Sequence, residues 1–362
     1  MVSRLIGRRL IPLLVTAAAV LSALPAGADA GVPRDFHGVA TVGYPPVTEL
    51  SRAYRGGATA VRQFISWSSV EPTPAERRWQ GLDEVVSRVA QSGLELVPVL
   101  YGSPSWVSSN PASPPVYSPQ SEAAWATFVG DLARRYGSNG TFWTLRPELP
   151  RVPIESWQLW NEVNLSFYWG GRPNARNYAR LVRLTNEALA VGDPAAKLIL
   201  AGLLPYKSTG AGSVPGGRYL QRFLRVKGVR KQFDAVAVHP YGKNPKVVLN
   251  GLTLARQALD AGGARRAPIW VTEFGWATAG VQLNTSPVRA SVGQQARWVS
   301  RTYTLMRKQA KRLRLRRAFY FSLSDADQPG EDFWSARMGL LGVDGQPKPA
   351  WFSYVRSAGG QP

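Results

Sequence analysis

The sequence has 362 residues, with 44 lysines and arginines against 23 aspartates and glutamates, two histidines and no cysteine. The lack of cysteine excludes disulfide scaffolds, thiol nucleophiles and cysteine-ligated zinc, and two histidines cannot build a histidine-rich metal site. Hydrophobic residues make up 44% of the chain, which is typical of a globular protein with a buried core. We therefore expect hydrolytic chemistry in this chain to use carboxylates or hydroxyls, without a metal or a cofactor.

The first thirty residues have the pattern of a secretory signal. Three arginines precede an apolar run over 10–24, and Ala28 and Ala30 mark a small-residue cleavage site. The apolar run, of about 15 residues, is shorter than the ~20 that a spanning helix needs, so a cleaved signal is favoured over a membrane anchor. We predict a signal peptide over 1–30 and a secreted or cell-wall-associated mature chain with no membrane span. The adjacent pair of arginines leaves twin-arginine export open beside the general secretory route.

After this signal, short apolar runs alternate with longer amphipathic segments. In chain order, the runs typical of buried strands are 36–43, 58–65, 94–100, 155–161, 197–203, 233–239, 268–273 and 317–323. The segments typical of helices are 47–55, 81–92, 120–136, 174–191, 216–226, 246–261, 286–310 and 349–358. Eight strand-then-helix units predict a single (β/α)8 barrel over 31–362. No Gly-x-Gly-x-x-Gly turn follows the first strand, which argues against a nucleotide-binding open sheet.

Several loops that follow predicted strands are long and rich in Tyr, Trp, Ser, Pro and Gly. They are 101–118, 163–173, 204–215 and 324–346. In a (β/α)8 barrel the loops after the strands form the active-site face, so we expect substrate to bind among these segments.

Two glutamates stand where predicted strands end. Glu162 closes the fourth strand in Trp160-Asn161-Glu162, and Glu273 closes the seventh. The carboxyl ends of barrel strands meet on one rim, so both side chains are expected in one site. Double-displacement glycoside hydrolysis needs such a pair, about 5–5.5 Å apart, with one group protonating the leaving oxygen while the other attacks the anomeric carbon.

These residues resemble the clan A retaining glycoside hydrolases, whose acid/base follows an Asn at strand four and whose nucleophile ends strand seven. Within that clan the chain is similar to family 39 and neighbouring actinobacterial enzymes. The matching segments cover residues 36 to about 355 in barrel order: Val61-Arg62 with Trp67 and Val70-Glu71-Pro72, Ser103-Pro104-Ser105-Trp106, Trp160-Asn161-Glu162, Val238-His239-Pro240-Tyr241, Val271-Thr272-Glu273-Phe274-Gly275-Trp276, and Gly339-Leu340-Leu341 with Pro347-Lys348-Pro349-Ala350-Trp351.

The resemblance implies a retaining glycosidase that cleaves β-glycosidic bonds of an oligo- or polysaccharide, with Glu162 as acid/base and Glu273 as nucleophile. It also implies that Asn161 donates to the sugar 2-hydroxyl and that Arg62 and Tyr241 orient the nucleophile. With the tryptophans of the long loops added, the expected substrate-binding residues are Arg62, Trp67, Trp106, Asn161, His239, Tyr241, Trp276 and Trp334.

One departure from the clan concerns the floor of the sugar site. Many members end strand eight with a Trp, whereas this chain has Phe321 followed by Ser322. Trp334 in the next loop is a candidate substitute. The sugar, the linkage and the choice between endo and exo cleavage stay open at this point.

Several of these residues also have a structural interpretation. Arg62 lies in an apolar strand and needs a carboxylate partner, for which Glu273 is favoured over Glu71. His239 is a candidate for the rim or the core. For Trp106, Trp169, Trp276 and Trp334, core packing stands beside sugar stacking. Asp325 and Asp327 form a weak candidate site for a bound cation.

Two other functional classes compete with a glycosidase. A barrel that has lost turnover and binds a cell-wall polysaccharide is the main alternative, and the presence of both glutamates disfavours it. The isoelectric point of about 10.7 raises nucleic-acid binding, but a secreted chain without a basic-aromatic recognition module argues against that partner.

Basic residues cluster at 134–135, 225–231, 265–266 and 307–317, at the ends of predicted helices or in the turns that follow. Those turns lie on the barrel face opposite the active site. One or two cations per helix end complement the helix dipole, but the last cluster exceeds that need. We expect this face to hold an anionic cell-envelope polymer through Arg312, Arg314, Arg316 and Arg317.

Overall fold

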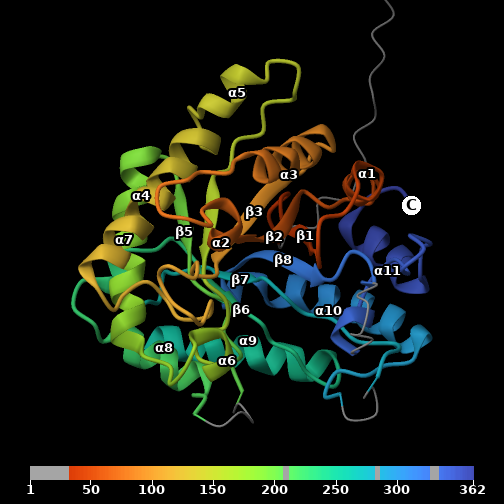
Figure 1. Ribbon diagram of the computed structural model, residues 1–362. Coiled ribbons are helices and arrows are strands. Elements are labelled where there is room, and N and C mark those ends of the chain that lie inside the picture. The colour runs from red at the N-terminus through yellow and green to blue at the C-terminus, as the bar shows by residue number, and fades with distance from the viewer. Residues whose placement is uncertain (1–31, 207–211, 282–285, 327–333) are drawn as a thin grey trace, which may run out of the picture.

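The computed structural model describes residues 32–206, 212–281, 286–326 and 334–362 (Figure 1). Eight strands form one parallel sheet in the order β5-β4-β3-β2-β1-β8-β7-β6. Parallel bridges from Ile199 to Ala235 and from Leu203 to Val238 join the two ends of this order. The sheet therefore closes into a barrel, and the predicted (β/α)8 fold is confirmed. The strands are β1 (His37–Ala40), β2 (Ala60–Ser66), β3 (Glu95–Tyr101), β4 (Ser156–Leu159), β5 (Lys197–Ile199), β6 (Val236–Val238), β7 (Ile269–Val271) and β8 (Leu315–Phe321).

Helices surround the barrel and connect successive strands (Figure 1). Those that follow the predicted amphipathic segments are α1 (Val47–Arg55), α3 (Gln80–Gln91), α4 (Pro119–Tyr136), α7 (Ala175–Gly192), α8 (Gly216–Leu224), α9 (Pro245–Ala261), α10 (Val292–Leu313) and α11 (Pro349–Ala358). Short helical segments within the connections, which periodicity did not predict, are α2 (Trp67–Val70), α5 (Thr141–Leu145), α6 (Ser166–Trp169), η1 (Val229–Lys231) and η3 (Trp334–Arg337).

The predicted and observed helix boundaries differ most at α10, for which the sequence pattern predicts 286–310. Ser291 and Gln294 form a reciprocal capping box, and this fixes the first helical residue at Val292. The helix ends at Leu313 because Arg314 adopts a left-handed conformation, with φ 53°, directly before β8.

The inside of the barrel has its own apolar core, separate from the layer between sheet and helices. Its members are Ala60, Val97, Ile199, Ala235, Ala237, Trp270 and Phe319. The small residues leave room for the stacked rings of Trp270 and Phe319, whose centroids are 6.1 Å apart. A Cβ on Gly38 of β1 would lie 2.5 Å from the Phe319 ring, so the absence of a side chain there admits this ring.

A cluster of paired charged residues lies next to this core and includes two arginines of the predicted basic face. Arg317 of β8 is 9% exposed, and its guanidinium lies 2.6 Å from Glu95, 2.9 Å from Asp35 and over the Trp270 ring. Arg316 is also paired with Asp35, at 2.8 Å. Arg317, expected on the basic face that holds an envelope polymer, is therefore not an exposed cation, because Glu95 and Asp35 neutralise it and the Trp270 ring covers it.

Residues 1–30, assigned above to a signal peptide, lie outside the described residues. Within 32–206, 212–281, 286–326 and 334–362, none of the helices combines the length and the apolar character that crossing a bilayer requires.

Candidate active site

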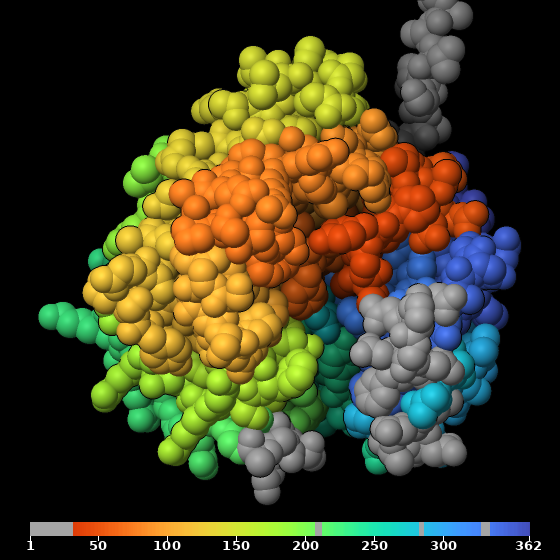
Figure 2. Space-filling model, in the orientation of Figure 1, coloured from red at the N-terminus to blue at the C-terminus, as the bar shows by residue number. Residues whose placement is uncertain are grey.

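The two glutamates that follow β4 and β7 lie together at the C-terminal ends of the strands. Glu162 and Glu273 are each 8% exposed. One carboxylate oxygen from each, together with a ring nitrogen of His239, lie within 4.8 Å of one another. The backbone is left-handed at Trp160 (φ 63°) and at Glu162 (φ 36°), and such strain is found mainly where function maintains it. The face shown in Figure 2 is hollowed near its centre, where segments far apart in the sequence meet.

Arg62 of β2 holds Glu273 in place from below. Its side chain is 1% exposed, and Nη1 donates to Glu273 Oε1 at 2.7 Å. Nε donates to Gln158 Oε1 at 2.6 Å, and Nη2 donates to Asn161 Oδ1 at 3.0 Å. Because a guanidinium only donates, it fixes the Asn161 amide with its oxygen toward Arg62, which leaves the amide hydrogens for another acceptor.

Two residues after β6 complete the contacts of the carboxylates. The Tyr241 hydroxyl donates to Glu273 Oε2 at 2.8 Å. His239 Nδ1 lies 2.8 Å from Glu162 Oε1 and 3.6 Å from Glu273 Oε2, while Nε2 lies 2.9 Å from Thr272 Oγ1. His239 is completely buried, so its expected contact with substrate is wrong. Its ring instead contacts both carboxylates and holds them in position.

The environment separates the proton affinities of the two carboxyl groups. Burial raises the pKa of Glu162, and the hydrogen bond from His239 only partly offsets this. Burial acts on Glu273 in the same direction, but His239, Arg62 and Tyr241 together outweigh it and hold the pKa of Glu273 below its ordinary value. One carboxyl group therefore retains its proton to higher pH while its neighbour is ionised, which is the division of roles between an acid and a nucleophile.

A pocket of about 290 Å³ opens beside Glu273. It is lined by Thr41, Val42, Gly43, Tyr44, Gln63, Phe64, Tyr168, Glu273 and Phe321. Phe321 thus lies in the pocket lining at the strand-eight position where many clan members have a Trp. Trp334 is not among the described residues that line this pocket, and its substitution for that Trp stays a prediction.

The sequence interpretation missed the other aromatic residues of this pocket. Phe64 lies two residues after Arg62 on β2. Because alternate side chains of a strand lie on one face, the sequence alone could have placed Phe64 beside Arg62. Tyr44 comes from a loop and Tyr168 from the short helix α6, and in neither segment does a periodic pattern predict where the side chain lies.

The remaining tryptophans are mostly core residues. Trp67 is completely buried, packs against Trp125 and Trp106, and donates to Glu71. Trp276 is also completely buried and donates to the Gly242 carbonyl. The expectation that Trp67 and Trp276 contact substrate is wrong, because neither exposes a ring face.

Trp106 and Glu71 both make contacts near Trp67. The half-buried Trp106 donates to the Glu71 carbonyl at 3.2 Å and does not line the pocket beside Glu273. The Glu71 carboxylate pairs with Arg77, so it does not compete for Arg62. Trp169, at 1% exposure, is a core residue.

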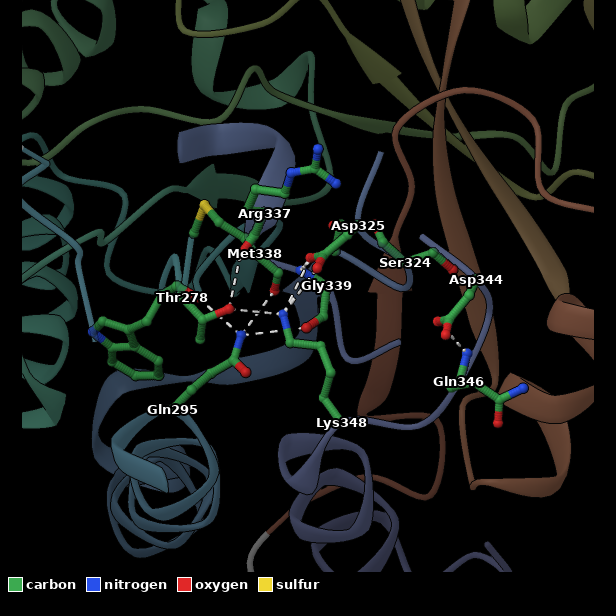
Figure 3. A network of polar contacts seen from close by, with 12 residues as sticks. Thr278, Gln295, Ser324, Asp325, Arg337, Met338, Gly339, Asp344, Gln346 and Lys348 are labelled. Atoms are coloured by element: carbon green, nitrogen blue, oxygen red, sulfur yellow. Dashed lines mark hydrogen bonds and ion pairs between the residues drawn. The ribbon is translucent and has the colours of Figure 1, made fainter. Parts of the chain in front are cut away.

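Asp325, a candidate cation ligand, is bonded instead to the ammonium group of Lys348 (Figure 3). Lys348 Nζ donates to both Asp325 oxygens at 3.2 Å and to Thr278 Oγ1 at 3.0 Å. Beside this pair, Gln295 Nε2 donates to the Trp276 carbonyl at 2.9 Å. The network connects the segment after Glu273 to the loop after β8, and the Lys348 ammonium group lies where a bound cation was only a weak candidate. Asp327 lies outside the described residues.

The spacing of Glu162, His239 and Glu273 would also suit metal ligands. A guanidinium 2.7 Å from Glu273 opposes a cation at that position, since two positive charges would share one carboxylate. The arrangement favours acid-base chemistry over metal binding.

Comparison with known proteins gives a family and a fold. Residues 161–350, more than half of the chain, match the family model described as glycosyl hydrolase catalytic core. No curated protein sequence matches the chain.

Similar solved structures include three glycoside hydrolases. A family 39 enzyme from Bacteroides cellulosilyticus has 21% identity and a TM-score of 0.67 over 91% of this chain and 64% of that one. A monomeric beta-xylosidase from Caulobacter crescentus has 17% identity and a TM-score of 0.65, with 90% and 68% covered. A GH5_18 enzyme from Bifidobacterium longum subsp. longum, in complex with Manβ1-4GlcNAc, has 16% identity and a TM-score of 0.64, with 90% and 78% covered.

This chain therefore spans just under two thirds of the Bacteroides enzyme, and identities of this size establish the fold alone. The family match includes both buried glutamates, and the resemblance to clan A enzymes of family 39 agrees with these neighbours. The chain belongs to the glycosyl hydrolase catalytic core family and is built on a (β/α)8 barrel.

Proposed function

We propose that this protein is a secreted retaining glycosidase that hydrolyses β-glycosidic bonds, with Glu162 as acid/base and Glu273 as nucleophile. The observation that carries the proposal is the pair of buried carboxylates with oxygens within 4.8 Å and pKa values moved in opposite directions. A retaining mechanism needs carboxyl groups about 5–5.5 Å apart, whereas an inverting one needs room for a water between them.

In the first step Glu273 attacks the anomeric carbon while Glu162 gives its proton to the leaving oxygen. Arg62 and Tyr241 each donate to a different Glu273 oxygen, so they hold the carboxylate ionised and oriented before attack. In the second step Glu162, now ionised, takes a proton from the water that releases the sugar from Glu273. The free amide hydrogens of Asn161 are available to a hydroxyl of the bound sugar throughout.

The pocket beside Glu273 indicates what kind of sugar is released. Its volume, about 290 Å³, is at the lower end of the range for small-ligand sites and suits one sugar ring. Apart from Glu273 its described lining carries no charge, and Tyr44, Phe64 and Phe321 offer apolar ring surface. We infer that the sugar bonded to Glu273 is uncharged.

Two variants test the assignment of roles. Glu273→Gly should abolish turnover because no covalent intermediate forms. Glu162→Ala should lose natural substrates yet still hydrolyse aryl glycosides whose leaving group needs no proton, with azide restoring part of the rate. Proton NMR of the first product should show retained anomeric configuration, and an inverted product would refute the two-step assignment. A parent protein that binds polysaccharide without any turnover would instead support the wall-binding alternative.

We also propose that the protein acts outside the cytoplasm, with residues 1–30 as the export signal. N-terminal sequencing of protein recovered from the medium or the envelope should begin at Gly31. A chain that retains residues 1–30 in the cytoplasm would contradict this proposal.

The barrel face opposite the carboxylates is proposed to bind an anionic envelope polymer, through a smaller set than the sequence indicated. Arg312 and Arg314 are exposed, whereas Arg316 is paired and Arg317 is buried. Arg312→Gln with Arg314→Asn should weaken binding to isolated envelope, and added salt should weaken it in the parent. Asn suits position 314 because it tolerates the left-handed backbone there. Envelope binding that ignores both changes would refute the proposal.

A further inference from the structure

A second cavity, outside the carboxylate site, has only positive charges among its lining residues. It has a volume of about 860 Å³ and lies between the segment that begins α7 and the end of α8. Five of its nine lining residues are cations: Arg172, Arg176, Arg222, Arg225 and Lys227. We call this cavity the basic groove. The yellow-green and green segments that form it lie at the lower left in Figure 2, where long side chains project from the surface.

The cations of the basic groove have no acidic partner within the described part of the chain. None of the nine lining residues is an aspartate or a glutamate. Another surface cavity, beside α3, shows the contrast, because there Arg88 is paired with Glu84 and Asp83 lies in the same lining. A concave surface with one sign of charge attracts counter-ions and raises their local concentration.

Helix electrostatics oppose the cation at the start of α7. Arg176 lies in the first turn of α7, where the helix dipole disfavours a cation, and that turn contains no acidic residue. Arg222 and Arg225 lie at the end of α8, where the dipole favours cations, but they are three residues apart and repel each other. The N-cap Asn174 already accepts from the amides of Arg176 and Asn177, so a ligand would meet the side chains and not these backbone groups.

The chain path connects the basic groove to the reaction centre. Tyr168 lines the pocket beside Glu273, and Arg172 lines the groove four residues later. Four residues span at most roughly 14 Å between their Cα atoms, which is the length of a few sugar units. A polysaccharide of a few sugar units is long enough to span this separation.

The proposed roles of Glu162 and Glu273, on which this inference rests, indicate on which side of the scissile bond the groove lies. The sugar pocket is lined mainly by residues of β1, β2, β8 and their loops, whereas Glu162 follows β4 and protonates the leaving oxygen. The groove also lies beyond β4, between helices that follow β4 and β5. We propose that the leaving-group part of the substrate is an acidic polysaccharide segment, whose carboxylates or phosphates bind the basic groove a few sugar units from the bond that is cut.

Arginines suit this role because their planar guanidinium groups bind carboxylate and phosphate oxygens in pairs. The probes are three labelled hexasaccharides on one β-1,4-glucan backbone: cellohexaose, its form oxidised to carboxylate at C6 of the reducing-end half only, and its form phosphorylated at C6 of those same sugars. Binding is measured by fluorescence anisotropy with the full chain carrying Glu273→Gln, so that no probe is cleaved. At least one acidic probe should bind about tenfold or more tighter than cellohexaose, and added salt should weaken it. The tighter of the two acidic probes identifies the substituent.

The deciding comparison uses two charge reversals of equal size. Arg172→Glu with Arg176→Glu should remove most of the preference for the acidic probe, whereas Arg265→Glu with Arg266→Glu, which do not line the groove, should leave it. Thermal unfolding checks that both pairs are folded. Equal binding of neutral and acidic probes, equal loss in both variants, or equally tight binding of a six-nucleotide RNA that depends on the same arginines would overturn the inference. Hydrolysis of a neutral aryl β-glycoside by the parent tests the glycosidase mechanism separately, so a failure of the groove and a failure of the mechanism give different results.

Discussion

Replacing Arg62 by Met should move the acid limb of the activity profile to higher pH. The limb reports the fraction of Glu273 that is ionised, and Arg62 is one of the groups that hold the pKa of Glu273 below its ordinary value. The guanidinium lies 2.7 Å from the carboxylate and is 1% exposed. Two charges with centres about 4 Å apart attract by about 4 kcal/mol at an effective dielectric constant of 20. Tyr241 and His239 remain in the variant, so we expect a displacement of about one to three pH units.

The assay should isolate Glu273 from Glu162. A 2,4-dinitrophenyl glycoside needs no proton for its leaving group, so kcat/KM against pH shows only the acid limb during formation of the covalent intermediate. Tyr241→Phe is the matched control, because it removes one neutral hydrogen bond from the same carboxylate and should displace the limb less, in the same direction. Arg62→Met should also cost about 3–5 kcal/mol of unfolding free energy, since it leaves a buried carboxylate unpaired. A folded variant whose acid limb coincides with that of the parent would refute this account of the nucleophile.

Three other predictions concern separate parts of the molecule. Glu162→Gln should lower kcat/KM for unactivated glycosides by about 10²–10⁴ and remove the basic limb, because the raised pKa of Glu162 sets that limb; a basic limb that persists would assign it to another group. Phe321→Ala should raise KM for an aryl glycoside about tenfold by removing a ring from the sugar pocket, whereas Trp334→Ala should not, and an equal effect of both would contradict the pocket assignment. Lys348→Met should lower the free energy of urea unfolding by about 3–5 kcal/mol, and adding Asp325→Asn should recover most of this loss; equal stabilities of the single and double variants would exclude the buried pair as the cause.

The sequence by itself determined the barrel and the positions of the two carboxylates. Both follow from local signals, because a strand buried on both faces is an uninterrupted apolar run and a helix of the outer ring has a period near 3.6 residues. The closing residue of a parallel strand lies on the active-site rim in any such barrel, so Glu162 and Glu273 were placed without knowing a single contact.

Only the tertiary structure decided which other residues complete the site. Trp67 and Trp276 are of a residue type that often stacks on sugars, yet packing buries them, whereas Tyr44 and Tyr168 reach the pocket from positions that no periodic pattern marks. The same distinction applies to the charged residues. The sequence counted an excess of cations, but Arg317 is neutralised by Glu95 and Asp35, while Arg172 and Arg225, 53 positions apart, line one groove. Local periodicity fixes which face of an element is buried, and only the packing of distant segments fixes which side chains meet.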